Sequence, residues 1–205
     1  KAKKHGQIIM RKYGLILILF LLGGCLEKEN PDVINGESMG TRYSVNALGD
    51  KRVSQELIDN RLVEINDIFS TWQEDSELSK LNRASVGSWV SVSDELHKIL
   101  KTSKELYRQT EGYFDPGIGR LIDLWGFGAK GGRTEVPQRE EISNAFAQSS
   151  IQYLMIEPGR VKKTKDIHMN LSAIAKGYAV DEIARLIKES GVTNFLVEIG
   201  GEVFA

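Results

Sequence analysis

Hydrophobic residues in this chain change their spacing several times between the period of a strand and the period of a helix. Residues 39–47 alternate, with Thr41, Tyr43, Val45 and Ala47 on one face, which predicts a half-buried strand. Helical spacing marks three longer segments: 54–70, 93–112 and 173–190. Because helices and strands are mixed rather than ordered as strict βαβ repeats, the pattern favours an α+β fold.

Short apolar runs indicate the remaining strands. Residues 153–156 and 167–169 flank a Pro158-Gly159 turn and a polar segment, and we expect them to pair as a hairpin. Residues 195–199 predict a further strand, which resumes at 202–205 after two glycines.

The N-terminal region has the organisation of a secretion leader. Two basic residues precede an uncharged window over 13–26, which is 14 residues long and too short to span a bilayer as a helix. Two glycines and Cys25 follow, and together they resemble the lipobox of bacterial lipoproteins. We therefore expect a signal peptide over residues 1–25, with Met10 as its start, and a polar tether over 26–35. An ordinary cleaved signal, or a buried strand with an incidental cysteine, is the alternative.

Charge and residue counts exclude several classes of function. The net charge is −1, and residues 1–25 contain five basic and no acidic side chains, so the rest of the chain carries −6. Such a chain is not expected to hold nucleic acid by bulk charge. A single cysteine excludes an intramolecular disulfide framework, and the three histidines do not have the spacing of zinc ligands.

Three polar or glycine-rich segments beside the patterned elements are candidate sites. Trp72 lies in a polar loop, where it would either stack on a planar ligand or fold back onto the core. Residues 111–119 contain a helix start that suits a phosphate, although a turn capped by Asp115 explains them equally well. Asn170 and Lys176 lie where a strand passes into a helix, which is either an anion and ring site or a capped junction with a solvated lysine.

Taken in order, five sequence blocks closely resemble the ApbE family of FAD:protein FMN transferases. They are Glu37–Thr41, Phe69–Trp72, Tyr113–Pro116 with Leu124–Gly128, Asn170–Asp181 and Glu198–Glu202. The resemblance covers residues 36–205, which would form the N-terminal part of the transferase domain. It implies mixed, largely antiparallel sheets with packed helices, related to the T-fold.

The resemblance also implies an activity and its site. Members use Mg²⁺ to transfer FMN from FAD to a threonine hydroxyl of a target flavoprotein, with release of AMP. By motif, the FAD contacts would be Met39, Trp72, Tyr113, Phe114, Asp115, Asn170 and Lys176. The carbonyl of Ala173 would bind Mg²⁺, and many members have Asp at the position of Asn170. No residue of this chain is assigned to proton transfer.

The family's side-chain Mg²⁺ ligands and a histidine-containing loop come after the segment that matches the end of this chain. The resemblance therefore implies a chain that lacks its C-terminal part, and residues 25–205 alone are expected to be inactive.

Expected partners and location come from the same resemblance and from the leader. Targets would be flavin-carrying subunits of sodium-pumping quinone reductases or Rnf-type complexes. A lipid on Cys25 would hold the protein on the extracytoplasmic, periplasmic side of a membrane in the bacterial envelope. Three alternatives remain open: an envelope lipoprotein that binds flavin, a Mg²⁺-dependent FAD pyrophosphatase, and a structural lipoprotein without a ligand.

Overall fold

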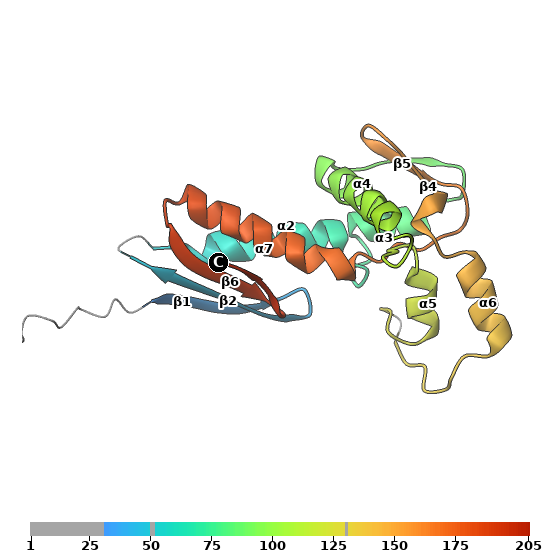
Figure 1. The fold of residues 1–205 in the computed structure, drawn as a ribbon, viewed down its shortest axis with the longest axis horizontal. Helices are drawn as coiled ribbons and strands as arrows, with labels where there is room; N and C mark the ends of the chain where they lie inside the picture. Colours follow the sequence, from blue (N-terminus) through green and yellow to red (C-terminus); the bar gives the residue numbers. More distant parts are fainter. Residues whose placement is uncertain (1–30, 50–51, 130) are drawn as a thin grey trace, which may run out of the picture. The chain divides into compact units, whose positions relative to one another are not determined.

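The first sheet is antiparallel and has the strand order β1-β2-β6-β7 (Figure 1). The strands are β1 (Asp32–Ser38), β2 (Thr41–Leu48), β6 (Asn194–Ile199) and β7 (Glu202–Phe204). The computed structural model describes residues 31–49, 52–129 and 131–205. The predicted signal peptide, Cys25 and residues 26–30 of the predicted tether lie outside these ranges. Residues 32–35, expected in the tether, form the start of β1 and pair with β2.

A tight turn joins β1 to β2 and places Met39 beside the candidate site. Ser38 pairs with Thr41, so the loop contains only Met39 and Gly40, whose φ angles are 53° and 72°. A type I′ hairpin turn needs positive φ at both of its central positions, which explains the glycine. The predicted strand therefore begins two residues later than expected, at Thr41, and Tyr43, Val45 and Ala47 are buried as the alternation predicted.

Two long helices, α2 (Gln55–Phe69) and α7 (Ser172–Glu189), lie side by side against this sheet (Figure 1). Ser54 begins α2 as its N-cap, since its hydroxyl accepts a hydrogen bond from the amide of Leu57. Most of the apolar stripe predicted for α2 is buried, but Leu57, which was expected in it, is 41% exposed. The buried positions are Ile58, Leu62, Ile65 and Phe69 on α2, and Ala175, Ala179, Val180, Ile183, Ala184 and Ile187 on α7.

The second sheet is also antiparallel, with the order β3-β5-β4. Its strands are β3 (Trp89–Ser91), β5 (Arg160–Lys163) and β4 (Leu154–Glu157). The helix α4 (Asp94–Gln109) packs against β4 and against a 3₁₀ turn at Ile151–Tyr153. The remaining helices are α3 (Glu77–Arg83), α5 (Gly119–Leu124) and α6 (Arg139–Ala147), and α5 packs on α6.

The predicted hairpin of 153–156 with 167–169 is wrong in its second strand. Residues 154–157 pair instead with Arg160–Lys163 across the Pro158-Gly159 turn. The basic side chains of β5 hid this strand, because only Val161 supplies an apolar buried position within it. Ile167 and Met169 are buried, which accounts for the apolar pattern at 167–169. This segment contributes only an isolated bridge, from His168 to Ile118.

The α+β class with largely antiparallel sheets is thus confirmed. Among the described residues, no helix is both long and apolar enough to cross a membrane.

Candidate functional site

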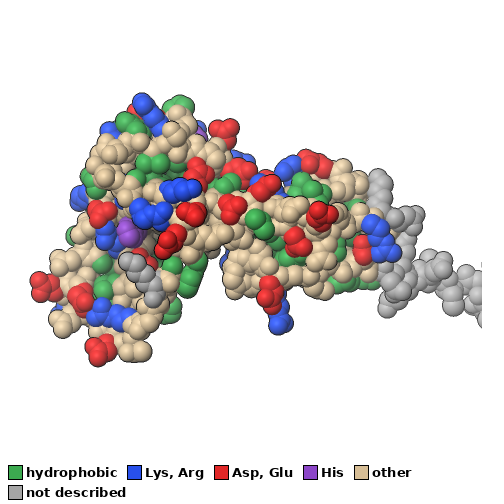
Figure 2. All heavy atoms as spheres, turned by 180° about the vertical axis from the view of Figure 1, so that it is seen from behind, with side chains coloured by type: hydrophobic (Ala, Val, Ile, Leu, Met, Phe, Trp, Pro, Cys, Tyr) green, Lys and Arg blue, Asp and Glu red, His purple; other side chains and the backbone are tan. Residues whose placement is uncertain are grey.

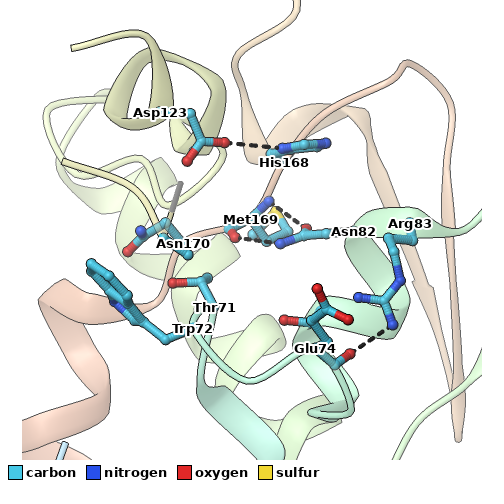
Figure 3. Close-up of a pocket in the computed structure, with 12 residues that line it drawn as sticks. Thr71, Trp72, Glu74, Asn82, Arg83, Asp123, His168, Met169 and Asn170 are labelled. Carbon is cyan, nitrogen blue, oxygen red and sulfur yellow. Dashed lines mark hydrogen bonds and ion pairs between the residues drawn. The ribbon is translucent and has the colours of Figure 1, made fainter. Parts of the chain in front are cut away.

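Two cavities adjoin each other at the loop between α2 and α3, and they share Thr71 and Trp72. The first has a volume of about 350 Å³ and the second of about 550 Å³. The first cavity, drawn in Figure 3, is lined by Thr71, Trp72, Glu74, Ser79, Asn82, Arg83, Gly119, Asp123, Ala129, His168, Met169 and Asn170. The second is lined by Met39, Gly40, Asn66, Phe69, Ser70, Thr71, Trp72, Gln73, Ser172, Ala175 and Lys176.

Hydrogen bonds to Ser70 fix the loop that carries Trp72. The Ser70 hydroxyl accepts from the amides of Trp72 and Gln73 at 3.1 and 3.2 Å. The Ser70 carbonyl accepts from the hydroxyls of Ser76 and Ser79 at the start of α3. The side chain of Trp72 is 67% exposed, so it does not fold back onto the core. The loop therefore presents an indole ring between the two cavities.

The segment 168–170 forms the opposite wall of the first cavity (Figure 3). The side-chain amide of Asn82 bonds both main-chain polar atoms of Met169: its Nδ2 donates to the carbonyl at 2.9 Å, and its Oδ1 accepts from the amide at 2.7 Å. The amide of Asn170 donates to the carbonyl of Pro116 at 2.8 Å. The Asn170 Oδ1 accepts from the amide of Ser172, the first residue of α7, at 3.0 Å.

Lys176 and Met39 come together in the second cavity, although they are far apart in the sequence. The Lys176 ammonium donates to Glu202 Oε2 at 2.8 Å and to the carbonyl of Gly200 at 3.3 Å. This fixes the amine one turn inside the N-terminus of α7, where negative charge on a ligand is favoured. Phe69 and Ala175 give the same cavity an apolar part.

Tyr113, Phe114 and Asp115 of the 111–119 segment line neither cavity. Tyr113 is 96% exposed, and Phe114 is partly buried. Asp115 Oδ1 accepts from the amides of Gly117 and Ile151 at 2.7 and 2.9 Å, so this carboxylate ties its own loop to the 3₁₀ turn. The segment reaches the first cavity through Gly119, which lines it, and through the hydrogen bond from the Asn170 amide to the Pro116 carbonyl. Met39, Trp72, Asn170 and Lys176 are the predicted contacts that the structure does bring together.

The described residues do not by themselves form a Mg²⁺ site. Ala173 is exposed in the first turn of α7 and lines neither cavity. Within residues 31–49, 52–129 and 131–205, no three His, Cys, Asp or Glu side chains cluster closely enough to hold a metal. Mg²⁺ requires about six oxygen ligands in a nearly octahedral arrangement, and one helix carbonyl does not supply them.

A histidine and a carboxylate in the first cavity were not anticipated from the sequence. His168 Nδ1 lies 3.4 Å from Asp123 Oδ2. Burial of the imidazole, together with the nearby Arg120, lowers the pKa of His168 in spite of Asp123. Asn82, Arg83 and Glu74 line the same cavity and were also missed. Asn82 and Arg83 lie on α3, and Glu74 lies in the loop before it. Asn82 is 87 residues from its partner Met169, and no spacing rule connects such distant positions.

The two cavities differ in chemistry. Both have amide and hydroxyl groups on their walls, but the first adds guanidinium and carboxylate groups, whereas the second adds apolar side chains and one ammonium group. Figure 2 shows basic and acidic side chains interspersed over the face it presents, rather than a field of one charge. An elongated ligand with a planar ring near Trp72 and an anionic centre near the start of α7 fits this arrangement. FAD has both features.

Comparisons with known proteins point the same way. A family model described as "ApbE family" matches residues 39–205. The FAD:protein FMN transferase of Vibrio cholerae is 36% identical over 191 residues, which are 90% of this chain and 57% of that protein. The Escherichia coli protein with the same description is 30% identical over 213 residues, covering 95% of this chain and 60% of its own length.

Solved structures agree with the sequence comparison. The flavin transferase ApbE from Vibrio cholerae superposes with a TM-score of 0.82 at 35% identity, over 85% of this chain and 59% of that one. The apo form of the Pseudomonas stutzeri flavinyl transferase ApbE gives 0.81 at 31% identity, over 87% and 61% of the two chains. This chain thus spans about three fifths of the length of these relatives.

Proposed function

The chain belongs to the ApbE family, and from this we propose that its protein transfers FMN from FAD to a threonine hydroxyl of a target flavoprotein, with release of AMP. The observation that carries the proposal is the pair of adjoining cavities with Trp72 exposed between them. A flavin mononucleotide joined to a second nucleotide is a ligand with two halves, and the site likewise has two compartments. The printed descriptions of the relatives support FAD as the flavin donor.

In the proposed reaction the threonine oxygen attacks the phosphorus of the FMN half. The new bond is a phosphoester, and the bond that breaks is the pyrophosphate P–O bond, whose electron pair leaves with AMP while the threonine loses its proton. Such transfers depend on positioning and on compensation of phosphate charge. This chain contributes the Trp72 ring, the N-terminus of α7 and the ammonium of Lys176 at 2.8 Å from Glu202. The family resemblance supports Mg²⁺ dependence, and the metal would compensate phosphate charge when it is bound.

The test is an assay with the complete gene product, FAD, Mg²⁺ and a target domain that has an acceptor threonine. We expect flavin fluorescence on the target band of a denaturing gel, together with one AMP released for each flavin attached. A target with its acceptor threonine changed to alanine is the matched control and should show no flavin fluorescence. AMP release that is equal with both targets would instead establish FAD hydrolysis, and FAD binding without AMP release would establish a flavin-binding lipoprotein.

Location and partners form a second part of the proposal. Two basic residues, a short apolar window and two glycines before Cys25 support lipidation of that cysteine and an extracytoplasmic, periplasmic location. Flavin-carrying subunits of sodium-pumping quinone reductases and Rnf-type complexes are the targets that we propose. A fatty-acid probe supplied to growing cells should label the protein, and the Cys25→Ala variant should remain unlabelled and uncleaved. Equal labelling of both proteins would refute the anchor.

A further inference from the structure

We infer that Asn82 is a positioning residue for the FAD site, because its side-chain amide holds Met169, and with it Asn170, against α3. The inference rests on the proposed function, since it concerns the same site. Asn82 lies in the last turn of α3 and is partly buried. None of the sequence blocks that indicated the flavin site contains it.

The side-chain amide of Asn82 bonds the main chain of Met169 in the way that a neighbouring β-strand would. The Met169 amide donates to Asn82 Oδ1 at 2.7 Å, and Asn82 Nδ2 donates to the Met169 carbonyl at 2.9 Å. The side chain of Met169 is only 1% exposed, so its main chain has little access to water. Buried main-chain polar groups need partners, and an unpaired one costs as much as a lost hydrogen bond. Asn82 thus does for Met169 what a neighbouring strand would do.

Asn82 is itself held from the other side. Its main-chain carbonyl accepts a hydrogen bond from Lys163 Nζ at 2.6 Å. Lys163 extends from β5 with its side chain 1% exposed, and its ammonium also lies 3.4 Å from Asp166 Oδ1. A buried cation at the C-terminal end of a helix stabilises the helix's last carbonyls. The end of α3 is therefore fixed before Asn82 reaches across to Met169.

The consequence of the clamp appears at the next residues. Asn170 follows Met169 directly, lines the first cavity and accepts a hydrogen bond from the amide of Ser172, the first residue of α7, at 3.0 Å. The first turns of α7 then carry Ala175 and Lys176 into the second cavity. Because Asn170 lines the first cavity and Ala175 and Lys176 line the second, a shift of Met169 that is passed along the chain would move both cavity walls. Asn82 is thus placed to control the position of groups that it does not touch.

An amide is needed for this contact because it presents one acceptor and one donor in the same plane. In the Asn82→Asp variant the first oxygen still accepts from the Met169 amide, but the second faces the Met169 carbonyl without a hydrogen. Protonation of that carboxyl group restores the donor. A positioning role therefore predicts that FAD binding by this variant depends on pH in a way that a general loss of stability does not.

The experiment compares three complete gene products: the parent, Asn82→Asp, and Asn144→Asp as the matched control. Asn144 is exposed on α6, away from Met169, and undergoes the same chemical change. The dissociation constant for FAD is measured by fluorescence between pH 5 and 8, with circular dichroism at each pH to establish folding. His168, Lys163, Asp166, Glu74 and Arg83 lie around the clamp in all three proteins, so the readout is the ratio of each variant to the parent.

We expect Asn82→Asp to bind FAD about tenfold more weakly than the parent at pH 8 and to approach the parent at pH 5. Asn144→Asp should match the parent throughout. Parent-like binding by Asn82→Asp at pH 8, or a folded variant that stays weak at pH 5, would overturn the inference. Absence of FAD binding by the parent would overturn the proposed function as well.

A second variant covers the case in which Asn82→Asp does not fold at pH 8. Asn82→Gln keeps the amide but moves it by one methylene, so we expect a loss of FAD affinity of about fivefold that is the same at pH 5 and pH 8. Unchanged affinity in Asn82→Gln would contradict the clamp, since a displaced amide cannot reach both Met169 atoms from the same backbone.

Discussion

Phe69 and Tyr178 meet edge to face, with ring centroids 5.3 Å apart and ring planes at 85°. Phe69 is the last residue of α2 and lines the second cavity, and Tyr178 lies on α7 two residues after Lys176. The Tyr178 hydroxyl donates to Glu95 Oε2 on α4 at 2.8 Å. One wall of the candidate site is therefore connected through an aromatic pair to a polar cluster among α2, α4 and α7.

Removal of the Tyr178 hydroxyl tests this connection. The Tyr178→Phe variant keeps the ring contact with Phe69 and loses the bond to Glu95. Burial and Glu95 raise the pKa of Tyr178, so the hydroxyl remains a donor at neutral pH. We expect the free energy of unfolding in urea to fall by about 1 kcal/mol with FAD affinity nearly unchanged. Tyr178→Ala, which also removes the ring, should cost about 3 kcal/mol and weaken FAD binding. Equal effects of the two variants would show that the ring contact contributes nothing.

Arg61 is the cation of the same cluster and provides a prediction with an internal control. Its guanidinium bonds Glu95 and Glu182 at 2.8 and 2.9 Å, and its side chain is 11% exposed. Arg185 also bonds Glu182, at 3.0 Å, but is 49% exposed. Arg61→Met leaves Glu95 without its cation and leaves Glu182 with the exposed Arg185 alone, so it should lower the free energy of unfolding by about 3 kcal/mol. Arg185→Met should cost less than about 1 kcal/mol. Chemical denaturation of both variants measures their losses of unfolding free energy. Equal losses would show that the burial of Arg61 does not set its contribution.

Much of the fold could be predicted from the sequence, because long helices and hairpins leave a local pattern. The helices at 55–69, 94–109 and 172–189 agree with the predicted ranges to within about three residues. The short helix α3 and strand β3 were missed, since seven and three residues are too few to establish a period. β5 was missed because Lys163 is buried at a position where the sequence indicates exposure.

The candidate site was predictable in part for a related reason. Trp72, Asn170 and Lys176 lie at or near the ends of elements, where a polar segment beside an apolar pattern indicates a candidate site. Asn82 could not be predicted in this way. It bonds Met169, which is 87 residues away in the sequence, and only the folded chain brings the two together. Asp115 stays a predicted ligand contact, and in the structure its carboxylate also accepts hydrogen bonds from the main-chain amides of Gly117 and Ile151.

Trp72 should dominate the fluorescence response to FAD. The chain has three tryptophans, and Trp72 is the one that lines both cavities. Stacking of an aromatic side chain on a base is worth about 1 to 3 kcal/mol, so Trp72→Ala should weaken FAD binding by about tenfold and remove most of the quenching. Trp89→Phe is the control, because Trp89 lies on β3 under Arg160 and Lys162. If Trp72→Ala and Asn170→Ala both bind FAD like the parent, the site lies elsewhere.

Two glycines should respond oppositely to alanine. A Cβ on Gly119 would lie 2.6 Å from the carbonyl oxygen of His168, at the wall of the first cavity. Since the obstacle is main chain, Gly119→Ala should cost about 2 kcal/mol and weaken FAD binding. A Cβ on Gly177, inside α7, would meet nothing within 4 Å. Gly177→Ala should therefore add about 0.7 kcal/mol through helix propensity. Thermal or urea unfolding of both variants measures whether each substitution lowers or raises the free energy of unfolding. A stabilised Gly119→Ala would disprove the close contact.

His168 should make the protein less stable as the pH falls below about 6.5, the ordinary value for histidine. Burial and Arg120 lower the pKa of His168 in the folded chain. The unfolded chain therefore takes up the proton first, and acidification favours unfolding. The slope for one group cannot exceed about 1.4 kcal/mol per pH unit.

Urea unfolding at intervals from pH 7.5 to pH 5 measures this slope in the parent and in His168→Asn, whose side chain can still bond Asp123. We expect the variant to show a flatter dependence over that range. The lower limit of pH 5 keeps Asp166 and Glu182 ionised in both proteins, because their pKa values lie below the ordinary carboxylate range. Identical slopes would mean that His168 keeps the same proton affinity in the folded and unfolded chains, in spite of its burial beside Arg120.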